Sequence, residues 1–117
     1  MAPPLLEFDK DIGEIKVSGE SIELEVTKFW NPLRDQVKDY LQHPRDIHFI
    51  VALEYFNTPA AHRILELCKY IENRCVETKR QFTVTWVYED EDMKSAGDHY
   101  ASILKKGTIF RFREESL

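Results

Sequence analysis

IHFIVAL, at residues 47–53, is the stretch of this 117-residue chain that decides the fold. It is short, almost continuously apolar and rich in β-branched side chains, which is typical of a strand covered on both faces. Because such strands belong to parallel sheets flanked by helices, we place this segment at the centre of a sheet.

The segment after this strand predicts a helix over residues 59–78. Thr58 supplies an N-cap, and Pro59 follows at the first helical position, which proline favours. An apolar stripe then recurs at helical spacing, opposite a polar face. The stripe consists of Ala61, Ile64, Cys68, Ile71 and Cys75, widened by Ala60, Leu65 and Leu67, and the polar face of Arg63, Glu66, Lys69 and residues 72–74.

The rest of the C-terminal half continues the alternation of strands and helices. Residues 81–88 (QFTVTWVY) alternate as a strand, with β-branched and aromatic side chains throughout. An acidic run at residues 89–92 (EDED) precedes apolar positions with helical spacing, so we expect a third helix that ends before Gly107. Residues 108–112 form a last strand.

The N-terminal part predicts a hairpin followed by a helix. Residues 5–8 and 14–18 are strand-like around a turn rich in Asp and Gly, and residues 25–41 carry a helical apolar pattern. Pro32 interrupts that pattern: either Asn31 caps a new helix, or the helix kinks at Pro32. The order of elements predicts an α/β fold, a single domain over residues 1–117 with its core at about 5–112. Its mixed, mainly parallel β-sheet has an N-terminal hairpin and about three helices packed against it.

Composition restricts the class of partner. Acidic residues outnumber basic ones 21 to 16, for a net charge of −5, which argues against nucleic acid and anionic membranes and favours protein partners. No apolar run approaches the ~20 residues of a membrane span, and residues 1–7 lack the pattern of a signal peptide, so we expect a cytoplasmic protein. Cys68 and Cys75 are seven residues apart on a predicted helix, about 10 Å and too far for a disulfide, so we expect reduced thiols.

Motifs for catalysis or for a cofactor are not found in the sequence, so we expect a non-enzyme without cofactor or metal. The chain has no glycine-rich phosphate loop, GxSxG or HExxH motif, and its four histidines fall on different elements. The acidic run at 89–92 fits a helix cap and an exposed surface better than a metal site, because neighbouring helical residues point in different directions. Thr58 has two interpretations, a simple N-cap and an accessible phosphoacceptor at a helix tip that tolerates negative charge.

Two segments give the chain a resemblance to a known family. Residues 53–58 (LEYFNT) and 84–97 (VTWVYEDEDMKSAG), together with residues 19–21 (GES) and the proline-containing helix at 29–41, resemble the SiaC family of bacterial regulatory phosphoproteins. The similarity extends over residues 5–112. Where family members commonly continue the Asn-Thr motif with serines, this chain has Pro59-Ala60-Ala61, so no alternative acceptor stands beside Thr58.

The resemblance implies a fold similar to STAS domains of the anti-anti-sigma type and a role in partner switching. It also implies that a Ser/Thr kinase phosphorylates the threonine of the motif, which would be Thr58 here, and that a PPM-type phosphatase removes the phosphate. In the family the unmodified protein binds and activates a diguanylate cyclase, so the resemblance implies control of cyclic di-GMP and of biofilm or aggregation behaviour. We expect a monomer or weak dimer whose partner-binding residues are Asn57, Thr58, Pro59, Ala61, His62, Leu65, Asp90 and Asp92.

Two other functions remain open at the level of the sequence. The domain is also compatible with an anti-anti-sigma antagonist that controls transcription through an anti-sigma kinase. A small metal-dependent enzyme that uses the acidic run at residues 89–92 is the second alternative.

Overall fold

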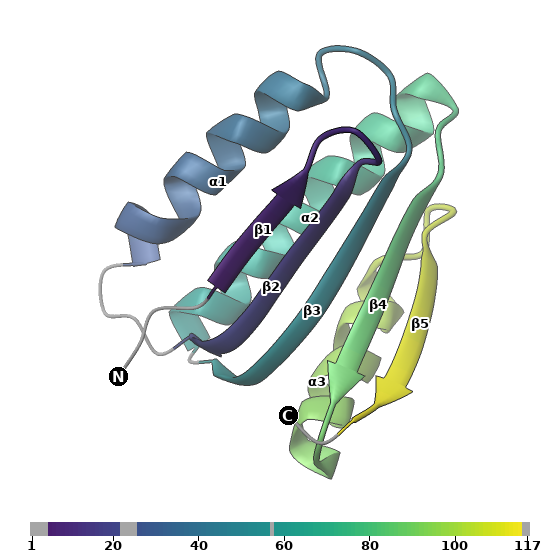
Figure 1. Ribbon diagram of the computed structural model, residues 1–117. Helices are drawn as coiled ribbons and strands as arrows, with labels where there is room; N and C mark the ends of the chain where they lie inside the picture. The colour runs from purple at the N-terminus through teal and green to yellow at the C-terminus, as the bar shows by residue number, and fades with distance from the viewer. Residues whose placement is uncertain (1–4, 22–25, 57, 116–117) are drawn as a thin grey trace.

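The computed structural model describes the backbone of residues 5–21, 26–56 and 58–115, and the side chains of residues 7–19, 31–54 and 61–115. Over these residues the elements alternate as the sequence predicts (Figure 1). In chain order they are β1 (Leu5–Asp9), β2 (Glu14–Ser21), α1 (Val26–Tyr40), β3 (Ile47–Phe56), α2 (Thr58–Thr78), β4 (Phe82–Tyr88), α3 (Glu91–Ile103) and β5 (Ile109–Glu114).

The strands form one sheet in the order β1-β2-β3-β4-β5. The hairpin pair β1 and β2 is antiparallel, whereas β2, β3, β4 and β5 run parallel to one another. The register places Val17 opposite Val51, Val51 opposite Trp86, and Trp86 opposite Phe112. The predicted mixed, mainly parallel α/β sheet with β3 at its centre is therefore confirmed.

All three helices pack on the same face of the sheet, so the expectation that β3 is covered on both faces is wrong (Figure 1). Phe49 and Val51 point to the helices and are fully buried. Ile50 and Ala52 point to the opposite face, where they form a small cluster with Val87 and are 9% and 6% exposed. The apolar run is continuous because neighbouring strands bury this second face locally, without a layer of helices.

Two helix boundaries answer questions that the sequence left open. α1 is one helix with Pro32 inside it, so the alternative in which Asn31 caps a new helix is wrong. α2 begins at Thr58, one residue before the predicted start at Pro59. The side chain of Thr58 lies outside the described residues, so its capping role stays a prediction.

The polar face predicted for α2 contains one error. Glu72 was expected on the solvent side, but it is only 4% exposed. Its carboxylate accepts hydrogen bonds from the backbone N–H of Lys106, at 3.2 Å, and from the hydroxyl of Thr108. These two donors compensate the buried charge and hold the loop between α3 and β5 against α2.

Candidate functional site

The candidate site lies at the edge of the sheet where β3 and β4 end. Because these strands are parallel, their carboxyl ends share that edge, and each is followed directly by a helix. α2 therefore starts at Thr58, and α3 starts at Glu91, within the acidic run at residues 89–92, on the same side of the molecule (Figure 1). Two segments that are about thirty residues apart in sequence are brought to one edge by the parallel register.

The first turns of α2 carry most of the predicted partner-binding residues. Asn57 lies outside the described residues, and for Thr58 and Pro59 the structure describes the backbone, which is helical, but not the side chains. Ala61 is half-buried and His62 is exposed. Leu65 is half-buried and packs against the core, so a partner could contact only its outer part.

The acidic run begins α3 with a helix cap, as predicted. Asp90 has extended backbone angles (φ −130°, ψ 171°), and its Oδ1 accepts the backbone N–H of Met93 at 2.9 Å. Glu91 and Asp92 lie in the first turn, where the helix dipole favours negative charge. Asp90 and Asp92 are both exposed, so the carboxylates remain available to a partner.

A buried tyrosine joins the two helices. The hydroxyl of Tyr100 on α3 donates a hydrogen bond to the backbone carbonyl of Ala61 on α2. Its ring lies 4.9 Å, centroid to centroid, from that of Trp86, and the indole N–H of Trp86 donates to the carbonyl of Met93 at 2.8 Å. A chain of contacts thus runs from the start of α2 to the turn that Asp90 caps.

The role of Tyr100 is not evident from the sequence, where its spacing places it among the apolar positions of the third predicted helix. A tyrosine in such a stripe does carry a signal, since a buried hydroxyl requires a hydrogen-bond partner. Burial raises the pKa of Tyr100, and the nearby Cys68 thiol raises it further. The hydroxyl therefore remains protonated and keeps its role as donor.

Gly97 allows α3 to lie directly on the sheet. A Cβ atom at this position would be 2.6 Å from Cδ1 of Trp86 and 2.8 Å from Cε1 of Phe112, closer than such atoms pack. The glycine therefore sets the distance between α3 and β4, and with it the position of Tyr100 relative to Ala61.

The other candidate groups do not join this edge. His48 points to the face without helices, where its Nε2 lies 2.8 Å from Oγ1 of Thr85 and its Nδ1 lies 3.8 Å from Oε2 of Glu14. Cys68 and Cys75 are buried free thiols, as predicted. Burial raises the pKa of both thiols, that of Cys75 to about 11, so neither is an activated nucleophile.

Two features are absent from the described part of the chain. It contains no group of three or more His, Cys, Asp or Glu side chains arranged to hold a metal ion. Within the same residues, no helix has both the length and the apolar character needed to cross a membrane.

Comparisons with known proteins agree with this architecture. Residues 2–112 match the model of a family described as SiaC family regulatory phosphoprotein. Among solved structures, the chain is similar to a crystal structure of the diguanylate cyclase SiaD in complex with its activator SiaC from Pseudomonas aeruginosa. The TM-score is 0.85 at 16% identity, and the match covers 97% of this chain and 93% of that one. A second structure, of SiaC from the same organism, has a TM-score of 0.85 and 15% identity and covers 96% of this chain and 90% of that one. The structure of apo-SiaC from the same organism has a TM-score of 0.81 and 16% identity, and it covers 97% of this chain and 90% of that one. At such identities the likeness shows the fold, and a search of the curated proteins found no match.

Proposed function

Because the chain belongs to the SiaC family of regulatory phosphoproteins, we propose that it is a non-enzymatic switch that binds and activates a diguanylate cyclase. In this proposal the unphosphorylated form is the activator, and it thereby raises cyclic di-GMP and promotes biofilm or aggregation behaviour. A Ser/Thr kinase ends the activation by phosphorylating Thr58, and a PPM-type phosphatase restores it. The protein acts as one domain, a monomer or weak dimer, in the cytoplasm, where the nucleotide substrates of kinase and cyclase are found.

The observation that carries the assignment to Thr58 is its place as the first residue of α2, at the edge that α2 shares with the start of α3. A helix N-terminus presents unpaired backbone N–H groups and the positive end of the helix dipole. A phosphate there adds about −1.5 to −2 charges at a place that stabilises them. The modification is therefore expected to leave the fold intact and to change only the surface.

Local charge supports the proposed effect on the partner. The cyclase would contact the start of α2 around Asn57, Thr58, Pro59, Ala61, His62 and Leu65, and the start of α3 through Asp90 and Asp92. Both carboxylates are exposed and already negative, so a phosphate on Thr58 turns a mixed surface into a strongly anionic one. A partner surface that fits the neutral hydroxyl is then repelled.

The size of this repulsion limits how complete the switch is. To move a two-state equilibrium from 1:99 to 99:1, the phosphate must change the free energy of binding by about 5.5 kcal/mol. An exposed charge pair contributes up to ~1 kcal/mol, so the phosphate must meet a desolvated part of the interface. Thr58 is therefore expected near the centre of the interface and not at its rim.

The experiment that tests the proposal combines mass spectrometry with binding. The chain is co-expressed with its cognate Ser/Thr kinase, and the modified residue is located by peptide mass spectrometry. Binding of the cognate cyclase, and its rate of cyclic di-GMP synthesis, are measured for wild type, Thr58→Ala and Thr58→Glu. We expect binding and activation with wild type and Thr58→Ala, and loss of both with Thr58→Glu.

Thr78→Ala is the matched control, because Thr78 ends the same helix at the opposite edge. It is expected to bind, activate and accept phosphate as wild type does. A phosphate found only on another hydroxyl, or equal binding by all three Thr58 forms, would contradict the assignment.

A further inference from the structure

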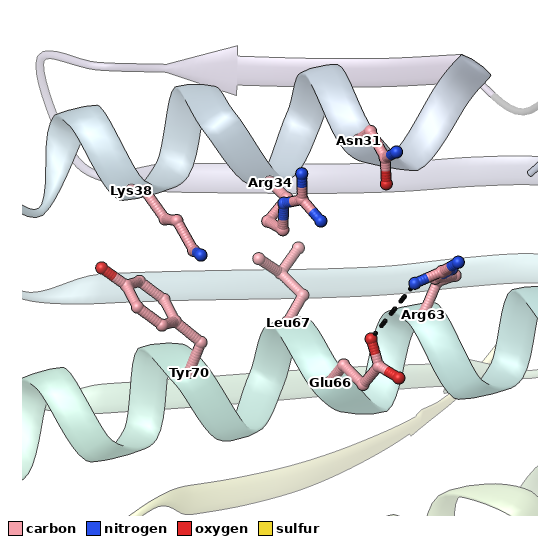
Figure 2. A pocket seen from close by; sticks show the side chains of 7 residues that line it. All are labelled: Asn31, Arg34, Lys38, Arg63, Glu66, Leu67 and Tyr70. Atoms are coloured by element: carbon pink, nitrogen blue, oxygen red, sulfur yellow. Dashed lines mark hydrogen bonds and ion pairs between the residues drawn. The ribbon is translucent and has the colours of Figure 1, made fainter. Parts of the chain in front are cut away.

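A groove runs between α1 and α2. Its main pocket has a volume of about 260 Å³. Figure 2 shows side chains of α1 and α2 facing one another across it. The lining residues are Asn31, Arg34, Lys38, Arg63, Glu66, Leu67 and Tyr70.

Positive charge is concentrated in this groove. Arg34 and Lys38, one turn apart on α1, face α2, while Arg63 rises from α2 on the other wall (Figure 2). Among the described residues of the lining, three are cationic and Glu66 is acidic, a sum of +2 on a chain whose net charge is −5; Asp35, beside Arg34, is not part of the lining.

These cations are only weakly engaged within the protein. Arg63 pairs with Glu66 at 3.4 Å in an exposed contact between neighbours on one helix. Arg34 pairs with the adjacent Asp35 at 3.3 Å, and Asp35 is 70% exposed. Exposed pairs of this kind contribute ~1 kcal/mol or less, so a ligand carboxylate can replace them at little cost.

The floor of the groove is apolar. Leu67 is 4% exposed and projects between the two helices, and Tyr70 is half-buried against the core beneath Lys38, whose Nζ lies 5.2 Å from the ring centroid. The groove therefore has a shallow apolar floor, with guanidinium and ammonium groups at its margins.

The dimensions favour an extended ligand. At about 260 Å³ the main pocket is smaller than the ~300–1,000 Å³ of typical small-molecule sites. A second hollow of about 410 Å³ continues it, sharing Lys38 and Tyr70 and reaching Glu77. From Arg63 to Glu77 is 14 residues, or about 21 Å of helix at 1.5 Å per residue. That length matches about four turns of a bound helix better than a compact nucleotide.

We propose that this groove binds an acidic amphipathic helix of a protein partner. The helix places an apolar side chain on Leu67 and Tyr70, and its carboxylates reach Arg34, Lys38 and Arg63. This is the helix-in-groove mode of recognition, with charge complementarity setting the register. The inference rests on the proposed function in one respect, that the ligand belongs to a protein partner, and it adds the chemistry of the segment that the partner presents.

The test selects ligands from a displayed library of 16-residue helical peptides with one randomised face, using the full chain as target. Selected peptides are expected to carry surplus Asp and Glu around a large apolar residue. Their binding is expected to weaken as sodium chloride is raised. In NMR titrations they should shift the signals of Arg34, Lys38, Arg63 and Tyr70.

Variants separate the groove from other surfaces. Arg34→Gln combined with Arg63→Gln is expected to weaken binding of a selected peptide about tenfold, because two charge pairs are lost. Arg111→Gln, which removes an exposed cation on β5, is expected to change it less than about twofold. Melting temperatures of all variants are recorded, so that loss of binding is not confused with loss of fold.

Four results would overturn the inference: selected peptides that are neutral or basic, signal shifts confined to another surface, failure to select any binder, or tighter binding of guanosine monophosphate or inorganic phosphate in the groove. The groove is tested by peptide binding with variants of Arg34 and Arg63, and the switch is tested by cyclase binding with variants of Thr58. A negative result for one proposal therefore leaves the other to its own measurement.

Discussion

The hydroxyl of Tyr100 on α3 donates a hydrogen bond to the backbone carbonyl of Ala61, 39 residues away on α2. Ala61 is the third residue after the proposed phosphoacceptor, Thr58. The bond fixes the start of α2 to the body of α3 and, through Trp86, to the turn that begins at Asp90. The two segments of the candidate site are therefore one connected unit.

Tyr100→Phe removes this hydrogen bond and keeps the ring. We expect the free energy of unfolding to fall by about 1 kcal/mol, the net contribution of a typical hydrogen bond, as measured by urea denaturation. Hydrogen exchange is expected to accelerate in the first turns of α2. Tyr88→Phe is the control, because no hydrogen bond of its hydroxyl is seen among the described residues. Equal effects of the two variants would argue against the link.

Gly97→Ala tests the close approach of α3 to the sheet. The added Cβ would be 2.6 Å from Trp86, and such overpacking costs about 1–3 kcal/mol. Alanine gains up to ~1 kcal/mol over glycine in helix propensity, so the net effect is expected to be destabilising. Ser95→Ala, exposed on the same helix, has no such clash and is expected to be neutral or slightly stabilising. A higher melting temperature for Gly97→Ala would show that α3 shifts freely.

Asp90 and Asp92 are expected to differ as contributors to stability. Asp90→Ala removes the cap of α3 and is expected to cost about 1 kcal/mol, whereas Asp90→Asn keeps a capping oxygen and most of the stability. Asp92→Ala loses only its interaction with the helix dipole, about 0.3–1 kcal/mol. Thermal denaturation of the three variants gives this order; equal losses for Asp90→Ala and Asp90→Asn would contradict a capping role.

The raised pKa of the buried Cys75 thiol predicts how the stability of the protein depends on pH in the alkaline range. Burial, with a further contribution from Asp46, raises the pKa of Cys75 from an ordinary value of 9.0 to about 11. A pKa raised on folding contributes stability that is fully present below about pH 9 and is lost as the pH rises toward 11. Urea denaturation at a series of pH values should show this decline, and it should be smaller in Cys75→Ala. A decline of the same size in Cys75→Ala would assign it to other groups.

The local pattern of the sequence was sufficient for most of the fold. Apolar residues at every third or fourth position predicted the helices, and the continuous apolar run at residues 47–53 predicted the central strand, because periodicity is a property of the backbone geometry itself. Strand and helix in alternation then required parallel strands, which bring Thr58 and the acidic run to one edge. That Thr58 is modified, and that the surrounding residues bind a partner, stay predictions.

The errors arose where burial depends on distant residues. Glu72 was placed on the polar face of its helix, yet the chain near Lys106 and Thr108 folds over it and supplies donors for its carboxylate. The run at residues 47–53 was expected to be covered by helices on both faces, but every helix lies on one face. In each case the pattern was correct for the element, and its surroundings were set by another part of the chain.

The sequence by itself thus determined the type and order of the elements and most of the apolar face of each helix. These features follow from backbone periodicity and from the rules of parallel connection. Only the tertiary structure decided which surfaces meet. The Tyr100–Ala61 hydrogen bond, the fit of Gly97 against Trp86 and the cationic groove between α1 and α2 depend on the distance and orientation between elements. Those quantities come from the packing of side chains far apart in sequence, which no local pattern encodes.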